Sequence, residues 1–167
     1  MLLALALSWS CSSTAPPSPQ PPAAPVPTGP VVAAAPTADV AAAEALITAL
    51  YAPYLVDDGI TPPLNTALPW APEMQAAWDR HAAPTEEGQA PPGFDPFVDA
   101  QDYELRALSV KGSPEPGGGI VVVAAFENFG TPATVSYTLV GTGSDWRVAD
   151  VRGRGGSLLK TLREWQP

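Results

Sequence analysis

Hydrophobic positions between residues 40 and 54 recur at intervals of three and four. This spacing is typical of an amphipathic helix. Asp39 precedes the first of them and suits a helix N-cap. The pattern predicts a helix over residues 40–52, ending near Pro53 and the turn at 57–59. Its buried face would consist of Val40, Ala43, Ile47, Leu50, Tyr51 and Tyr54.

A second helix is predicted in APEMQAAWDRHAA, residues 71–83. Its apolar side would carry Met74, Ala77, Trp78 and His81. A connection rich in glycine and proline, residues 84–93, follows it. That connection leads to the acidic stretch DPFVDAQD at 95–102.

After Tyr103 the hydrophobic period changes from 3.6 to 2, which indicates strands. Short turn clusters such as SPEPGGG and FGTP separate the strands and predict a four-stranded antiparallel meander. The expected strands are YELRALSVK (103–111), GIVVVAAFEN (119–128), ATVSYTLVG (133–141) and WRVADVR (146–152). SLLKTLREW (157–165) closes the chain as a short helix capped by Ser157. The expected fold class is therefore α+β, with two N-terminal helices on one face of the sheet.

Charged residues are distributed unevenly along the 167-residue chain. No charged side chain occurs before Asp39, whereas residues 39–102 hold eleven acids and one arginine, and the whole chain carries a net charge of −9. A strongly acidic protein without a basic stripe is repelled by phosphate backbones, so nucleic acid is not an expected partner. We expect one domain over residues 39–167, preceded by two segments of another nature.

The first of these segments, MLLALALSWSC at 1–11, is apolar and ends at the only cysteine. It is too short to span a bilayer and is typical of a secretory signal. Its ending resembles a bacterial lipoprotein signal, in which the cysteine becomes the lipidated first residue. Ser10 fits that signal, whereas Ser8 and Trp9 depart from it. Lipidation of Cys11 is the preferred interpretation, and plain secretion or a chance cytosolic N-terminus are the alternatives.

The second segment, residues 12–38, consists of Pro, Ala, Ser, Thr and Val with few other residues. Such a composition cannot bury enough apolar surface to fold, so a disordered, extended tether is expected. At about 3.1 Å per residue its reach is roughly 80 Å. A lipid on Cys11 and this tether together predict an outer-membrane lipoprotein whose domain lies on the periplasmic face of the cell envelope. Ser12, directly after the cysteine, favours the outer membrane by the same resemblance.

Three motifs carry a family resemblance. LYAPY at the end of the first helix, DPFVDAQD before the sheet and WRVADVRGRGGSLLKTL at the end resemble a bacterial family named only as domain of unknown function 3828. That family is similar to the cystatin-like folds typified by nuclear transport factor two. The resemblance covers residues 39–167 and implies a curved sheet wrapped around helices as a cone. It implies no reaction, because this architecture hosts enzymes and binding modules alike.

The stretch DPFVDAQD allows three interpretations: a structural junction, a cation site, or a set of polar contacts for a ligand. Asp95 followed by Pro96 suits a helix start, which would place Asp95, Asp99 and Asp102 on one helical face. The spacing does not fit an EF-hand loop, so a cation site is disfavoured and no metal is predicted. A structural junction is preferred, and the remaining alternative has Gln101 and Asp102 as polar ligands at a cavity mouth.

The sequence supports a functional role less strongly for the other candidate residues. His81 is the only histidine and suits a half-buried position better than catalysis. Arg152, Arg154 and the neighbouring glycines in RGRGG (152–156) could cradle an anion, but a strand exit is preferred. The tryptophans Trp70, Trp78, Trp146 and Trp165 suit the core or its rim better than a ligand cage. No catalytic residue and no cofactor are predicted.

The last candidate is Asp150. Strand alternation places it on the same face as Trp146 and Val148, which makes it a carboxylate in phase with the core. It would bond to a backbone amide or an arginine such as Arg106, or would contact a ligand together with Asp102 and Tyr137. The predicted ligand-binding set is thus Gln101, Asp102, Tyr137 and Asp150.

These features favour a non-enzymatic envelope domain that binds a small molecule, a cell-wall fragment or a protein. A cavity enzyme of the isomerase or dehydratase kind is the first alternative. An inhibitor or immunity protein directed at a cell-wall hydrolase is the second.

Overall fold

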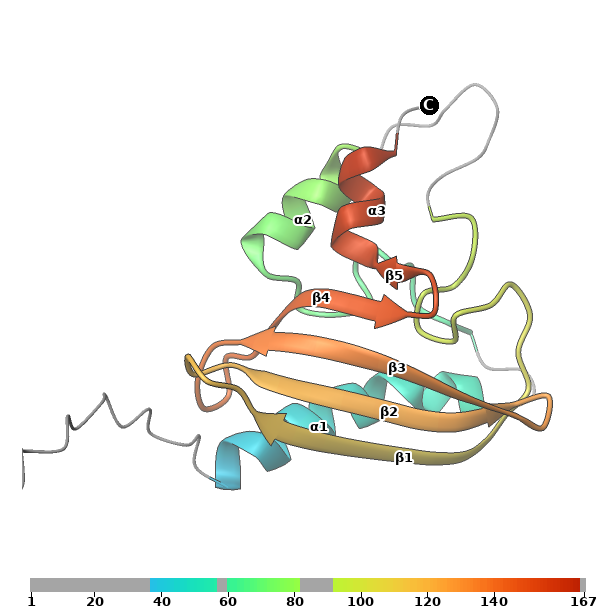
Figure 1. Cartoon of the computed structure of the whole chain (residues 1–167), viewed down its shortest axis with the longest axis horizontal. Coiled ribbons are helices and arrows are strands. Elements are labelled where there is room, and N and C mark those ends of the chain that lie inside the picture. Colours follow the sequence, from blue (N-terminus) through green and yellow to red (C-terminus); the bar gives the residue numbers. More distant parts are fainter. Residues whose placement is uncertain (1–36, 57–59, 82–91, 166–167) are drawn as a thin grey trace, which may run out of the picture. The chain divides into compact units, whose positions relative to one another are not determined.

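The computed structural model describes residues 37–56, 60–81 and 92–165. Within these residues the domain is α+β, as predicted. It contains three α-helices and one antiparallel sheet that is open (Figure 1). The predicted segment 1–11, the predicted tether 12–38 except its last two residues, the turn at 57–59 and most of the 84–93 connection lie outside the described residues.

The first helix, α1 (Thr37–Tyr51), continues as a 3-10 turn, η1 (Ala52–Leu55). The predicted apolar face is confirmed: Ala43, Ile47 and Tyr51 are fully buried. The predicted N-cap is wrong, because the helix begins at Thr37, two residues before Asp39, and Asp39 lies in its first turn. The Asp39 carboxylate instead accepts the backbone N–H of Gly143.

The sheet contains five strands in sequential order, each antiparallel to the next. The four predicted strands are present. The expected count of four misses β5, two residues that pair with the end of β4 after a turn at Arg154 and Gly155. The strands are β1 (Leu105–Pro114), β2 (Ile120–Asn128), β3 (Thr131–Val140), β4 (Arg147–Gly153) and β5 (Gly156–Ser157).

Two strands contain an irregularity that bends them. In β1 the pairing shifts between Arg106 and Ser109, where Ala107 has a φ of 55°. In β4 the pairing shifts between Val148 and Asp150, so Ala149 is an extra residue opposite β3. Bulges of this kind bend a strand and increase its twist.

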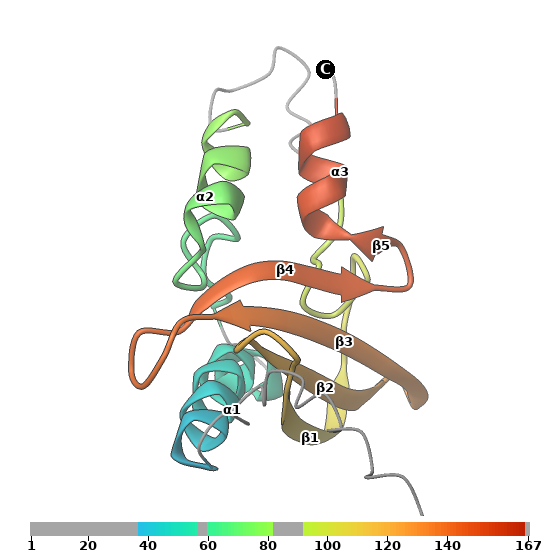
Figure 2. The ribbon, with the colours of Figure 1, turned by 60° about the vertical axis from the view of Figure 1, so that its left-hand side comes forward.

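Helices α2 (Pro72–Asp79) and α3 (Leu158–Glu164) stand side by side next to β4 (Figure 2). Met74, Ala77 and Trp78 of α2 are buried as predicted. The predicted cap of α3 is confirmed, since the Ser157 hydroxyl accepts the N–H of Lys160 at 3.1 Å. An ion pair between Arg163 and Glu73 joins the two helices.

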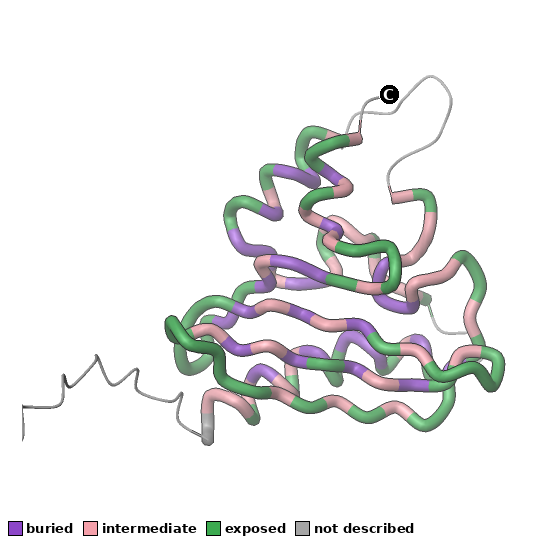
Figure 3. The backbone as a smooth tube through the Cα atoms, in the orientation of Figure 1, coloured by how far each residue is buried: buried purple, intermediate pink, exposed green. Residues whose placement is uncertain are grey.

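The core consists of side chains from the sheet and from all three helices, and buried positions alternate along the strands (Figure 3). Ile120, Val122 and Ala124 of β2 face the same interior as Val135, Tyr137 and Leu139 of β3. The largest fully buried side chains include Tyr51, Tyr137, Phe97, Ile47 and Met74. Trp70, Trp78 and Trp146 also belong to this core, as expected, whereas Trp165 is half-buried against the His81 ring.

Candidate functional site

Two tyrosine hydroxyls meet in the middle of the core. The Tyr51 hydroxyl donates to the carbonyl oxygen of Phe97 at 2.7 Å, and it lies 2.8 Å from the Tyr137 hydroxyl. Tyr51 has a single proton to donate, so Tyr137 donates to Tyr51. Burial raises the pKa of both tyrosines, which keeps both neutral. Through these hydrogen bonds Tyr137 links β3 to α1 and, by way of Tyr51, to the loop at residues 94–100.

A tyrosine also faces an aspartate at the edge of this core. The Tyr54 hydroxyl donates to Asp95 Oδ2 at 2.6 Å, and the Phe97 amide donates to Asp95 Oδ1 at 2.8 Å. Burial raises the pKa of Asp95, and the hydrogen bonds from Tyr54 and from backbone amides oppose that rise. The Tyr103 ring packs on the Tyr54 ring with centroids 5.0 Å apart. Burial and the bond to Asp95 also raise the pKa of Tyr54, so its hydroxyl keeps its proton and remains the donor of this hydrogen bond.

The helix start that Asp95 and Pro96 suit in sequence does not form. Asp95 and Ala100 pair through their backbones instead, and Asp99 takes a left-handed conformation with a φ of 53°. Asp95 bonds to Tyr54 from η1 and Asp99 bonds to Arg154 from the β4–β5 turn. The bonds to these two distant partners contribute more free energy than the local preference of Asp95 and Pro96 for a helix start. The three carboxylates therefore do not share a face.

Gln101 and Asp102 lie on the surface. The Gln101 side chain donates to the Gly93 carbonyl at 3.1 Å. Asp102 is exposed, and its backbone carbonyl accepts the Asn128 side chain at 3.3 Å. Neither residue meets Tyr137, which is fully buried.

Asp150 lies on the opposite face of the sheet from the one predicted. The extra residue Ala149 changes the phase, so Asp150 pairs with Thr138 while Val151 pairs with Tyr137. Side chains of paired residues project from the same face, and successive residues alternate. The placement of Asp150 on the face of Val148 is therefore wrong, and the structure does not bring Asp150 together with Tyr137.

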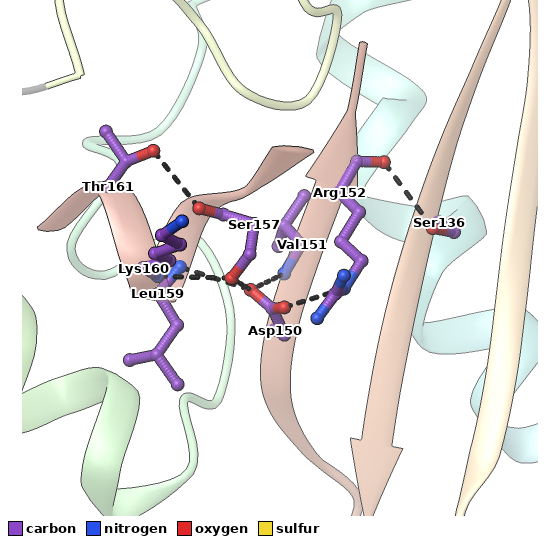
Figure 4. Close-up of polar contacts among 8 residues, drawn as sticks. All are labelled: Ser136, Asp150, Val151, Arg152, Ser157, Leu159, Lys160 and Thr161. Atoms are coloured by element: carbon purple, nitrogen blue, oxygen red, sulfur yellow. Dashed lines mark hydrogen bonds and ion pairs between the residues drawn. The ribbon is translucent and has the colours of Figure 1, made fainter. Parts of the chain in front are cut away.

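The Asp150 carboxylate joins β4 to the start of α3 (Figure 4). Oδ1 accepts the N–H groups of Val151 at 3.0 Å and Leu159 at 3.1 Å, and the Ser157 hydroxyl at 2.9 Å. Oδ2 pairs with Arg152 Nε at 2.9 Å. The partners are backbone amides and an arginine, which is the structural alternative of the sequence analysis, with Arg152 in place of Arg106. Arg106 instead pairs with Glu104.

Two surface clefts lie near the β4–β5 turn, and none of the four predicted ligand residues lines either one. The smaller has a volume of about 50 Å³ and is lined by Phe94, Pro96, Asp99, Val151, Gly153, Gly155, Gly156, Leu158 and Thr161. The larger, which we call the hairpin cleft, has a volume of about 250 Å³. It is lined by Val98, Asn128, Phe129, Thr131, Pro132, Ala133 and Arg154.

Phe129 and Arg154 are the prominent side chains of the hairpin cleft. The sequence pointed to Arg154 as part of a possible anion cradle, but Arg152 turns to Asp150 and takes no part in this cleft. Phe129 was not among the candidate residues predicted from the sequence. The signal that could have found it is its place in the two-residue turn before Gly130, where Asn is the usual residue.

The remaining candidates carry structural contacts. The His81 ring is bonded through Nε2 to the Leu162 carbonyl of α3. The indole N–H groups of Trp78 and Trp146 are buried without a hydrogen-bond partner among the described residues. In the same part of the chain no three His, Cys, Asp or Glu side chains gather as metal ligands. No helix of the described ranges is long and apolar enough to cross a membrane.

Comparisons with models of protein families, with curated proteins and with solved structures gave no match for this chain.

Proposed function

We propose that this chain is an envelope-tethered binding domain that holds a partner on its surface. The main support is the occupied interior. Where a cone-shaped fold would place a ligand, Tyr51, Tyr137 and Phe97 fill the space with exposed fractions of 0%. Their polar groups bond to one another. A ligand there would have to displace a packed and hydrogen-bonded cluster, whereas a surface partner would not.

We also propose that the domain is of the cystatin-like class and related to the family that its motifs resemble. An open antiparallel meander with a long helix across its inner face is consistent with that class. The bulges in β1 and β4 supply the bending that a cone requires. An inhibitor or immunity protein for a cell-wall hydrolase would be one form of this surface-binding function.

The location follows from the N-terminal sequence. Lipid on Cys11 and the uncharged tether of residues 12–38 would hold the domain at the periplasmic face of the outer membrane. Cys11→Ser should move the protein from the membrane to the soluble fraction. Mass spectrometry of the native chain should find its mature N-terminus at a modified Cys11. An unmodified, soluble native chain would contradict the anchor.

Photo-cross-linking in cells tests binding at the surface. A photoreactive residue would be placed in turn at the exposed positions Leu55, Val123 and Phe129. We expect a covalent adduct of defined mass at one of these positions and not at all of them. Adducts at none of them, together with a small molecule that is released when the purified protein is denatured, would contradict surface binding and favour a cavity ligand.

A cavity enzyme is the second candidate, and the Asp95–Tyr54 pair favours it. Burial raises the pKa of Asp95, and a hydroxyl lies 2.6 Å away, as in a general acid–base pair. Asp95→Asn would abolish such chemistry and leave surface binding intact. Retained cross-linking in this variant would separate the two candidates.

A further inference from the structure

The turn between β2 and β3 places an aromatic side chain where the backbone disfavours it. Phe129 and Gly130 form a two-residue turn with φ values of 48° and 73°. Turns with two left-handed residues favour Asn-Gly. The left-handed conformation is unfavourable for a residue other than glycine. The Phe129 side chain is 60% exposed, so burial in the core does not offset this cost.

An arginine stands at the same cleft in a fixed orientation. Arg154 donates its backbone N–H and its Nε–H to Asp99 Oδ2 at 2.8 and 3.1 Å. Its Nη2 donates to the Asp99 carbonyl at 3.4 Å. The Asp99 side chain is 9% exposed, whereas that of Arg154 is 80% exposed. The carboxylate therefore lies beneath and the guanidinium faces outward, with both Nη1 hydrogens and one Nη2 hydrogen free of Asp99.

The rest of the cleft combines apolar side chains with the polar residues Asn128 and Thr131. Val98, Pro132 and Ala133 contribute apolar surface, and Arg154 is the only charged side chain that the described residues contribute to the lining. The Asn128 amide is already used by the Glu104 N–H and the Asp102 carbonyl. A volume of about 250 Å³ equals that of about eight water molecules, which is room for one amino-acid residue.

We propose that the hairpin cleft binds the C-terminal residue of a protein partner, with its carboxylate on Arg154 and its apolar side chain against Phe129. A guanidinium that is held by an acid on one side can still bind a planar carboxylate through its free edge. An exposed aromatic residue beside an arginine is also the composition of interface hot spots. The net charge of −9 disfavours ligands with several negative charges, such as phosphates or wall peptides with additional carboxylates. This proposal rests on the surface-binding function proposed above.

Titration of the full chain by amide NMR tests it, with N-acetyl-Ala-Leu as the probe and the corresponding C-terminal amide as the matched control. We expect the acid to shift the amide resonances of residues 129–131, 133 and 154, and to bind at least about fivefold more tightly than the amide. Arg154→Gln should remove this preference. Arg106→Gln, which alters an exposed arginine outside the cleft, should retain it.

The variant Phe129→Asn tests whether the aromatic side chain is needed for binding and not for the fold. Asn suits the left-handed turn, so this variant should be at least as stable as the native chain while binding the acid at least about fivefold more weakly. Equal binding of acid and amide, shifts elsewhere on the domain, or unchanged binding in both Phe129→Asn and Arg154→Gln would overturn the proposal. Tighter binding of N-acetyl-D-Ala-D-Ala than of the L-peptide would overturn the assignment to a protein partner. A cross-link at Val123 but not at Phe129 would preserve surface binding and reject this site.

Discussion

The carboxylates of Asp150 and Asp102 contribute differently to the stability of the fold, because their surroundings differ. Asp150 is 8% exposed and accepts three hydrogen bonds besides its pairing with Arg152. The Asp102 side chain is exposed and no hydrogen bond reaches its carboxylate among the described residues. A buried acceptor with several donors stabilises the fold, whereas an exposed one contributes little.

Asp150→Ala is expected to lower the free energy of unfolding by about 2–4 kcal/mol, because two backbone amides and the Ser157 hydroxyl lose their acceptor. Urea denaturation measures this loss. Asp102→Ala is the control and should change stability by less than about 0.5 kcal/mol. A stable Asp150→Ala protein that has lost binding to its partner would instead restore Asp150 as a ligand contact.

Asp95 makes stability depend on pH. Burial raises the pKa of this carboxyl above its ordinary value of 3.8, so the folded state holds the proton more tightly than the unfolded state. Its contribution to stability is therefore present below about pH 3.8 and is lost as the pH rises through the folded-state pKa. Asp95→Asn has no such titration, so we expect its stability relative to the native chain to increase over this range. Urea denaturation of both proteins from about pH 3.5 to 7 gives this difference, and parallel curves would contradict it.

At the scale of the elements, turns decide how the strands meet. The β3–β4 loop contains Gly141 and Gly143, both at positive φ. A Cβ on Gly141 would lie 2.2 Å from the Asp145 carbonyl oxygen, whereas a Cβ on Gly143 would meet nothing within 4 Å. The Gly143 amide also bonds to Asp39 and so ties this loop to α1. Only the first glycine is required for close packing of the backbone.

Gly141→Ala should therefore cost more than about 3 kcal/mol of stability, because a backbone atom cannot move aside as a flexible side chain would. Gly143→Ala in the same loop should cost only about 1 kcal/mol, for the left-handed conformation. Thermal unfolding of the two variants compares these losses. If they were equal, conformational strain alone would account for the role of Gly141.

At the scale of the whole molecule, the chain combines a domain with an N-terminal segment of very different composition. The described core begins with α1 at Thr37, close to the boundary predicted at residue 39. Limited proteolysis should cut before α1 and leave a product whose melting temperature matches that of the full chain, since a segment of this Pro- and Ala-rich composition is not expected to bury enough apolar surface to join a core. Mass spectrometry and thermal unfolding of the product check this. A product that unfolds at a lower temperature would show that the N-terminal segment contributes to the fold.

The amino-acid sequence by itself determined the elements whose signals are local. The helical spacing of Ala43, Ile47 and Tyr51, the alternation in β1 and β3 and the Ser157 cap each depend on residues within a few positions of one another. Hydrophobic period and capping chemistry operate at that range, so α1, α2, α3 and four strands could be predicted. The order of the strands followed from the short turns between them.

The tertiary structure alone decided where the polar side chains meet. One extra residue, Ala149, moved Asp150 to the other face of the sheet, because strand phase has a period of two. Residues 95–100 formed a turn and not a helix, because Tyr54 and Arg154 hold Asp95 and Asp99 from 41 and 55 positions away. The hairpin cleft joins Phe129 to Arg154 and Val98 for the same reason. Such long-range contacts leave no periodic trace in the sequence, so a candidate site built from them appears only when the chain is folded.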